Sequence, residues 1–131
     1  IVGSQTFIDR CHRFRKMFGG GMRQAGVLAG AGLYALENHI ERMADDHRRA
    51  RALAEAIGAI EGIEVSLESV KTNMVYIDVS GTGHDAAAVV DKLNAQGISL
   101  TAVSDQKLRA VTHLDVDDDG IHRAVEAFNN L

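Results

Sequence analysis

The sequence predicts an α/β fold in which a long helical segment precedes a small two-layer domain. Apolar residues recur every three or four positions up to Ile57, which is the period of a helix. From Ile63 onward, short segments alternate between apolar and polar residues, as strands do. The 131-residue chain has no proline, so glycine marks its breaks. We therefore expect helices over residues 1–58 and an α/β domain over residues 59–131.

The helical segment is predicted to begin with a short basic helix over residues 7–18. Three consecutive glycines, Gly19 to Gly21, should end it, because glycine loses the most backbone entropy in a helix. No strong breaker follows Gly32, so one long helix of roughly 50 Å is expected over residues 22–57. Its apolar stripe is Leu36, Ile40, Met43, His47, Ala50, Ala54 and Ile57.

The second part is predicted to follow the order β-β-α-β-β-α. Gly97 should end the first of its two helices, and Asp117 or Asp118 should cap the second. Helices packed on one face of a largely antiparallel sheet would bury these patterns. The expected strands are residues 63–67, 73–79, 98–103 and 107–112, and the first helix is residues 84–96.

Charge is distributed unevenly along the chain. Residues 1–24 hold five basic side chains and one acidic one, whereas residues 25–131 hold nine basic and 17 acidic ones. The basic run is either a solvated helix face or a site for phosphate or carboxylate. Nucleic acid is not an expected partner, because the net charge of the chain is −4 and the basic run is short.

The sequence also predicts a cytoplasmic protein without a membrane partner. Its longest weakly polar run, residues 25–36, is shorter than the roughly 20 residues that span a bilayer. No signal peptide is visible, and a single cysteine, Cys11, suits a reducing compartment.

The segment from Asp115 to Glu126 matches the spacing of a calcium-binding loop. A calcium loop should follow a helix, however, and a strand is expected before Asp115. His122 stands where an apolar residue usually anchors such a loop, and the same carboxylates suit the first turn of a helix. No two histidines lie three or four residues apart, so we expect no metal site.

Arg109 is the clearest candidate for ligand binding. It shares a strand face with Val111, which we expect to be the apolar side of the strand, where an arginine is costly unless it is paired. A fixed guanidinium there is suited to holding a carboxylate in bidentate fashion. The alternative is an edge-strand arginine that reaches water. Lys16 and Arg23, on either side of the three glycines, could gather at one anion.

Three segments carry a family resemblance. Residues 15–26, RKMFGGGMRQAG, closely resemble the R-K-M-x-G-G-G-M-R-Q-[AS]-G segment of low-specificity L-threonine aldolases. Residues 71–74, KTNM, and 108–113, LRAVTH, resemble the T-N-M and R-L-V-T-H signatures of that family. Ala110 departs from the bulky aliphatic residue usual there.

The resemblance implies a pyridoxal-phosphate (PLP) enzyme with the aspartate-aminotransferase-like fold. Such enzymes cleave L-threonine and L-allo-threonine to glycine and acetaldehyde, and a homotetramer built as a dimer of dimers is implied. By residue match, Arg109 would bind the substrate carboxylate. Lys16 and Arg23 would lie at the phosphate of a neighbouring subunit's cofactor.

The same resemblance implies that the catalytic lysine lies elsewhere. In the family, this Schiff-base lysine has a Ser-Lys-Gly context upstream of the segment that matches Ile1, and no lysine here has that context. We therefore expect the C-terminal portion of an aldolase, inactive alone, whose upstream cofactor domain belongs to the same protein. The alternatives are a stand-alone anion-binding or oligomerisation module and a β-eliminating lyase with other substrates.

Overall fold

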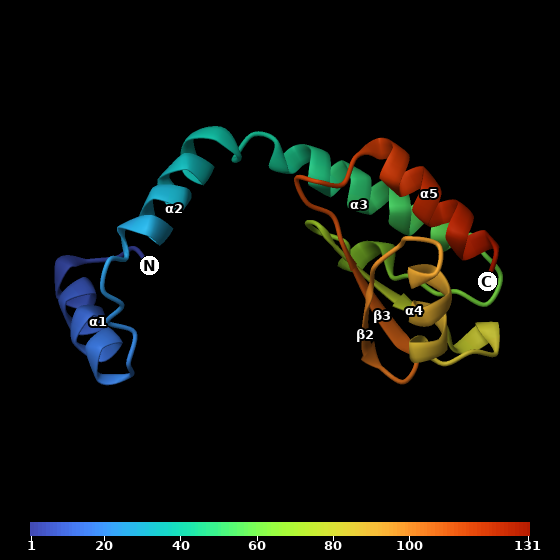
Figure 1. Ribbon diagram of the computed structural model, residues 1–131, viewed down its shortest axis with the longest axis horizontal. Coiled ribbons are helices and arrows are strands. Elements are labelled where there is room, and N and C mark those ends of the chain that lie inside the picture. Colours follow the sequence, from blue (N-terminus) through green and yellow to red (C-terminus); the bar gives the residue numbers. More distant parts are fainter. The chain divides into compact units, whose positions relative to one another are not determined.

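The computed structural model describes all of residues 1–131, which form two compact units, residues 1–40 and 41–131 (Figure 1). The first unit holds helices α1 (Gln5–Met17) and α2 (Gly26–Asn38), and neither helix contains a buried residue. The second unit contains the buried core. None of the α-helices is both long and apolar enough to cross a membrane.

Helix α1 confirms the basic helix that the sequence predicts. The side chain of Ser4 accepts a hydrogen bond from the backbone N–H of Phe7, which satisfies a free donor at the start of the helix. After the last turn, Gly19 adopts a φ of 79°, a left-handed conformation that favours glycine. The three glycines thus end the helix as expected.

The prediction of one long helix over residues 22–57 is wrong. Helix α2 ends at Asn38, and α3 (Met43–Ile57) begins after a short turn. The Asn38 side chain donates to the carbonyl of Tyr34 at 2.8 Å, a bond that competes with continued helix. Two acidic residues, Asp45 and Asp46, lie in the first turn of α3 and stabilise a separate helix start.

The predicted apolar stripe consequently splits into two parts. Ala50, Ala54 and Ile57 are fully buried on α3, whereas Leu36 and Ile40 are more than half exposed. Helix α3 packs on the last helix and on the sheet, so it belongs to the second unit. The division between units falls after Ile40, one helix earlier than the predicted boundary at residue 58.

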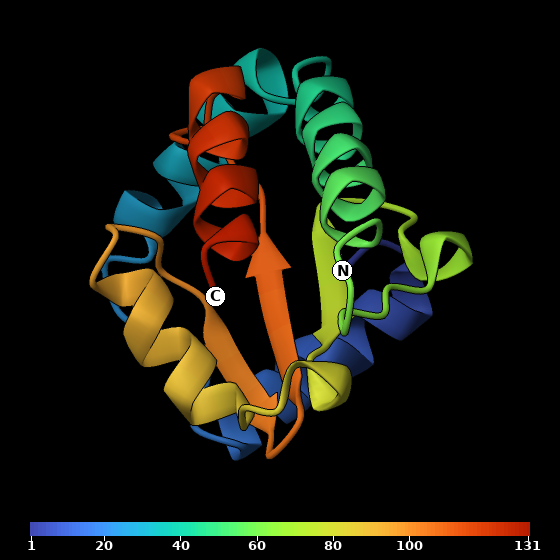
Figure 2. The same cartoon turned by 90° about the vertical axis from the view of Figure 1, so that its right-hand side faces the viewer.

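The sheet of the second unit has three antiparallel strands in the order β1 (Met74–Asp78), β3 (Lys107–Val111), β2 (Thr101–Ser104). One face of it is covered by α3, α4 (Ala86–Asn94) and α5 (Asp118–Asn129), as Figure 2 shows. This confirms the two-layer α/β architecture. The fully or almost fully buried residues of the sheet point toward these helices: Val75, Ile77, Leu108 and Ala110.

The first of the four predicted strands, residues 63–67, does not form. Glu64 exchanges two backbone hydrogen bonds with Asp78, each 2.9 Å long, and the chain then leaves the sheet. A short 3-10 helix follows at Leu67–Ser69, where the Arg51 guanidinium donates to the Leu67 carbonyl. The pairing therefore stops after one residue pair.

The end of α4 and the start of α5 agree with the predictions made from the sequence. Gly97 adopts a φ of 79° beyond the end of α4, as a residue in this position often does. The structure selects Asp117 as the cap of α5, because its carboxylate accepts the Gly120 N–H at 2.7 Å. Asp118 instead occupies the first turn of that helix.

A buried hydrogen-bond cluster joins α3 to the sheet. The Thr112 hydroxyl donates to the Asp46 carbonyl at 2.7 Å, and its backbone N–H donates to the Asn73 carbonyl. The Asn73 amide donates in turn to the Thr112 carbonyl at 2.8 Å. The cluster thereby ties the approach to β1, the end of β3 and the first turns of α3.

Replacing Thr112 with valine should lower the free energy of unfolding by about 1–2 kcal/mol, because a buried hydrogen bond is lost while the shape is kept. Urea unfolding followed by circular dichroism measures this change. The same substitution at exposed Thr101 should change stability by less than about 0.5 kcal/mol. Equal effects at both positions would contradict a stabilising role for the cluster.

Candidate functional site

The face of the sheet opposite the helices carries the candidate site. In an antiparallel sheet, the side chains of two directly paired residues point to the same side. Each set of paired residues therefore forms one row of side chains across this face. One row pairs Met74 with Val111, and both side chains are exposed by 40% or more. We call this side of the sheet the open face, because no helix of the second unit covers it.

Arg109 lies in the middle of the open face. It is on β3, the central strand, so the alternative of an edge-strand arginine is wrong. Its position on the same face as Val111 is confirmed, but the expectation that this is the apolar side of the strand is wrong, because Leu108 and Ala110 alternate with Arg109 and point into the core. The structure thus presents a half-buried guanidinium at the centre of a three-stranded sheet.

The Arg109 guanidinium lacks a protein partner. Its Nε atom is buried and makes no hydrogen bond, and no carboxylate forms an ion pair with it. A buried donor without an acceptor costs about 1–3 kcal/mol. An acceptor supplied by a ligand would remove this cost.

Two hydroxyl-bearing residues flank Arg109 in register. Tyr76 on β1 is its partner on one side, and Thr101 on β2 is its partner on the other. Both side chains are exposed. We call Tyr76, Arg109 and Thr101 the donor row.

The third row of the open face is charged. Asp78 pairs in register with Lys107. Hydrogen bonds from the side chain and backbone of Ser80 lower the pKa of Asp78, and the charge of Lys107 lowers it further. The Asp78 carboxylate is therefore already hydrogen-bonded by Ser80, just beyond the end of β1.

The basic segment in the first unit has a distinct geometry. The Lys16 side chain folds back over the glycine turn, so a Cβ atom at Gly21 would lie 3.0 Å from its Cδ and 3.4 Å from its Nζ. Neither Lys16 nor Arg23 forms an ion pair. All ion pairs of the structure are formed by residues of the second unit, within the range 42–118.

The predicted site residues therefore fall in different units. Arg109 belongs to the second unit, whereas Lys16 and Arg23 belong to the first. Each set has free cationic groups.

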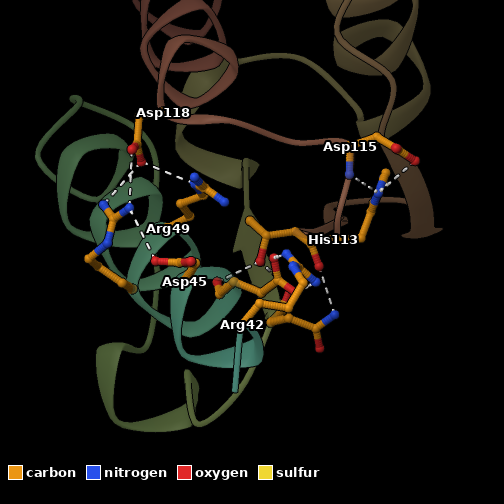
Figure 3. Close-up of polar contacts among 10 residues, drawn as sticks. Arg42, Asp45, Arg49, His113, Asp115 and Asp118 are labelled. Carbon is orange, nitrogen blue, oxygen red and sulfur yellow. Dashed lines mark hydrogen bonds and ion pairs between the residues drawn. The ribbon is translucent and has the colours of Figure 1, made fainter. Parts of the chain in front are cut away.

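A separate ion-pair cluster joins α3 and α5 (Figure 3). Asp118 accepts hydrogen bonds from Arg48 and Arg49, each at 3.1 Å, and Arg48 also approaches Asp45 at 3.8 Å. These contacts lower the pKa of Asp118 to about 2, with the Arg48 hydrogen bond as the largest cause. The ion pairs of α3 thus reach a second helix, whereas Asp46 is buried and pairs with Arg42.

We expect Asp118 to make stability depend on acid pH. Its pKa is depressed in the folded state, so its contribution is present above its ordinary value of 3.8 and lost as the pH falls toward 2. Asp118→Asn should therefore flatten the fall in unfolding free energy between about pH 4 and pH 2. Urea titrations across this range measure the difference from the unsubstituted chain.

Asp119 provides the matched control for this experiment. It is the next residue of the same helical turn and forms no ion pair. Asp119→Asn changes the net charge equally, so it should leave the acid dependence largely as it is. A pH profile that is equally flat in both variants would contradict the role of the Arg48 and Arg49 pairs.

In the segment that matches the spacing of a calcium-binding loop, residues 115–126, three of the carboxylates make other contacts. Asp117 caps α5, Asp118 pairs with the α3 arginines, and the Asp115 carboxylate lies 3.6 Å from His113 Nδ1 (Figure 3). A strand and a short loop precede Asp115, as expected, rather than a helix. No group of three or more histidine, cysteine or acidic side chains in the chain is arranged to hold a metal ion.

Comparison with known proteins identifies the family. A family model described as beta-eliminating lyase matches residues 1–80, which is more than half of the chain. The chain belongs to the beta-eliminating lyase family. Residues 81–131, which include Arg109, lie beyond the matched range.

Curated relatives extend the likeness to nearly the whole chain. Low-specificity L-threonine aldolase 1 of Arabidopsis thaliana is 36% identical over 129 residues, covering 98% of this chain and 36% of that protein. Low specificity L-threonine aldolase of Escherichia coli K12 is 40% identical over 116 residues, covering 88% of this chain and 33% of that protein. This beta-eliminating lyase family member thus spans about a third of the length of these relatives.

A solved structure supports the fold of this family member. It is described as a C-DES mutant with glycine covalently linked to the PLP cofactor, and the two structures match with a TM-score of 0.66. The match covers 82% of this chain and 28% of the other, at 22% identity. At that identity the likeness establishes a shared fold, in agreement with the fold class predicted from the sequence.

Sequence reasoning missed two kinds of residue in this family member. Tyr76 and Thr101 were not recognised as neighbours of Arg109, although the alternation of Met74, Tyr76 and Asp78 placed Tyr76 away from the core. Asn73 and Thr112 lie within the motif segments, but the sequence indicates no role for them. Their mutual hydrogen bonds now show that the two motif segments are adjacent.

Proposed function

We propose that this chain is the C-terminal portion of a PLP-dependent threonine aldolase that cleaves L-threonine and L-allo-threonine to glycine and acetaldehyde. The observation that carries the proposal is the unpaired guanidinium of Arg109 at the centre of the open face. The names of the relatives and the three motif segments support the same reaction.

Arg109 would bind the carboxylate of the amino acid substrate. A guanidinium can hold both carboxylate oxygens through parallel N–H donors, which fixes the orientation of the group as well as its position. That orientation determines which bond at Cα is aligned for cleavage. Arg109 is therefore proposed as a binding residue that contributes to orientation.

The first unit has residues that fit the phosphate of PLP. Lys16 and Arg23 have no carboxylate partner, and the glycine turn between them lacks side chains that would keep an anion away. We propose that they hold the phosphate of a cofactor bound by a neighbouring subunit. When bound, PLP supplies an acceptor for the electron pair left at Cα.

Helix α2 supports assembly with other parts of a larger enzyme. Its apolar side chains are exposed on all sides, and apolar helices of this kind are normally buried. We propose that the helices of residues 1–58 lie at a subunit interface of a cytoplasmic homotetramer, a dimer of dimers. The upstream cofactor domain of the same protein would supply the remaining contacts.

Borohydride trapping tests the assignment of the cofactor lysine. The 131-residue chain and the complete protein are each incubated with PLP, reduced and digested, and labelled lysines are mapped by mass spectrometry. We expect stoichiometric labelling of one lysine in the complete protein, outside residues 1–131, and only scattered labelling of the isolated chain. Stoichiometric labelling at one of Lys16, Lys71, Lys92 or Lys107 would contradict the proposal.

A further inference from the structure

We propose that Tyr76 and Thr101 bind the substrate carboxylate together with Arg109, so that the donor row acts as one carboxylate site. This inference rests on the proposed function of Arg109 and adds two residues to it. The observation behind it is the register of the sheet, which places one hydroxyl-bearing residue on each side of the arginine.

The geometry of the row supports a shared ligand. Side chains of directly paired residues have Cβ atoms about 4.5–5.5 Å apart, so each hydroxyl-bearing side chain is an immediate neighbour of Arg109. Tyr76 is 47% exposed, and Thr101 is exposed as well. No hydrogen bond of the structure occupies the hydroxyl of either residue. Both hydroxyls are free to donate to a group that reaches Arg109.

The composition of the row favours an acceptor as its ligand. Arginine has five N–H donors and no acceptor, and each hydroxyl has one O–H to donate. The carboxylate on β1, that of Asp78, belongs to the adjacent row and accepts a hydrogen bond from the backbone N–H of Ser80. A carboxylate has two oxygens with about four acceptor positions, so it can satisfy Arg109 and a hydroxyl at the same time.

The rows on the two sides of the donor row differ in polarity. Met74 and Val111 form an apolar row toward one end of the open face, and Asp78 and Lys107 form a charged row toward the other. Lys107 has Asp78 as its register partner, whereas Arg109 has two neutral neighbours. The donor row is therefore the row of the open face whose cation has no carboxylate opposite it in register.

Acetate binding to the 131-residue chain tests the inference without cofactor or turnover. The probe is sodium acetate, titrated at constant ionic strength against sodium chloride. The readout is the NMR shift of the backbone N–H signals of β1, β2 and β3, which every variant retains, and in chains that keep the arginine also the shift of the Arg109 Nε–H. We expect a saturable shift. Tyr76→Phe and Thr101→Val should each weaken the acetate Kd about threefold to tenfold, because each removes only a hydroxyl that donates to a charged group.

The variants separate this inference from the proposed function. If Arg109→Gln abolishes acetate binding while Tyr76→Phe and Thr101→Val bind like the unsubstituted chain, the donor row is wrong and Arg109 stands alone. If Arg109→Gln binds acetate normally, the role of Arg109 is wrong as well. An unsubstituted chain without a saturable shift would overturn the shared site.

Kinetics of the complete enzyme provide the second readout. Tyr76→Phe and Thr101→Val should each raise the KM for L-threonine about tenfold while changing kcat less, because they weaken binding of a non-reacting group. Lys107→Gln is the matched control, since it alters the same face outside the donor row. Unchanged KM in both hydroxyl variants would contradict the proposal.

Discussion

Replacing Arg109 with glutamine in the complete enzyme is expected to lower kcat/KM for L-threonine by about 10²- to 10³-fold. A bidentate guanidinium makes two charge-assisted hydrogen bonds, each worth about 1.5–3 kcal/mol, and glutamine replaces neither. Loss of orientation at Cα adds to the loss of binding, so we expect kcat to fall as well as KM to rise. Steady-state assay of acetaldehyde release measures both constants.

Arg109→Lys and Lys107→Gln complete this experiment. Lysine keeps the charge without the planar fork of donors, so Arg109→Lys should recover only part of the lost activity. Lys107→Gln removes a positive charge two residues away on the same strand face and should change kcat/KM less than about threefold. Equal losses for Arg109→Gln and Lys107→Gln would show a general charge effect and contradict a specific carboxylate site.

Phe128→Ala should give the largest loss of stability in the second unit, about 3–5 kcal/mol. Phe128 is 1% exposed and is among the largest fully buried side chains, in the core formed by three helices and the sheet. Alanine would leave a cavity that rigid neighbours fill only partly. Urea unfolding of the 131-residue chain, followed by circular dichroism, measures the effect.

Two further substitutions make the stability prediction decisive. Phe128→Leu retains most of the volume and should cost less than the alanine variant, which keeps the site measurable if Phe128→Ala fails to fold. Phe14→Ala removes the same ring from α1, where Phe14 is 44% exposed, and should cost less than about 1 kcal/mol. Similar losses at Phe14 and Phe128 would contradict the location of the core.

Much of the second unit could be predicted from local patterns. The alternation of Val75, Ile77 and Val79 predicted β1 and its buried side, and all three are fully buried. Gly97 and Asp117 predicted helix ends because their roles depend on nearby backbone alone. The fold class followed from the order of such elements.

The wrong predictions concern segments whose structure is not decided by hydrophobic periodicity alone. Continuous apolar spacing indicated a helix through residues 38–42, but the Asn38 side chain binds the Tyr34 carbonyl and the chain turns. Residues 63–67 have strand composition, but pairing with β1 ends after Glu64. Periodicity reports the preference of a segment, whereas these outcomes depend on a competing side chain and on a sheet edge.

The candidate site was predictable in part for the same reason. Period two placed Arg109 and Val111 on one face, and the structure confirms this. The neighbours of Arg109 depend on strand register, which brings Tyr76 and Thr101 together from positions 25 residues apart in the chain. The roles of Lys16 and Arg23 at a cofactor phosphate remain predictions from the family resemblance.

Product analysis of the complete enzyme with L-threonine tests the central claim most directly. Cleavage between Cα and Cβ yields glycine and acetaldehyde in equal amounts, whereas β-elimination yields ammonia and 2-oxobutanoate. We expect glycine and acetaldehyde at one to one, without 2-oxobutanoate, from the complete protein and not from the 131-residue chain. Ammonia and 2-oxobutanoate as the main products, or aldol cleavage by the isolated chain, would contradict this account.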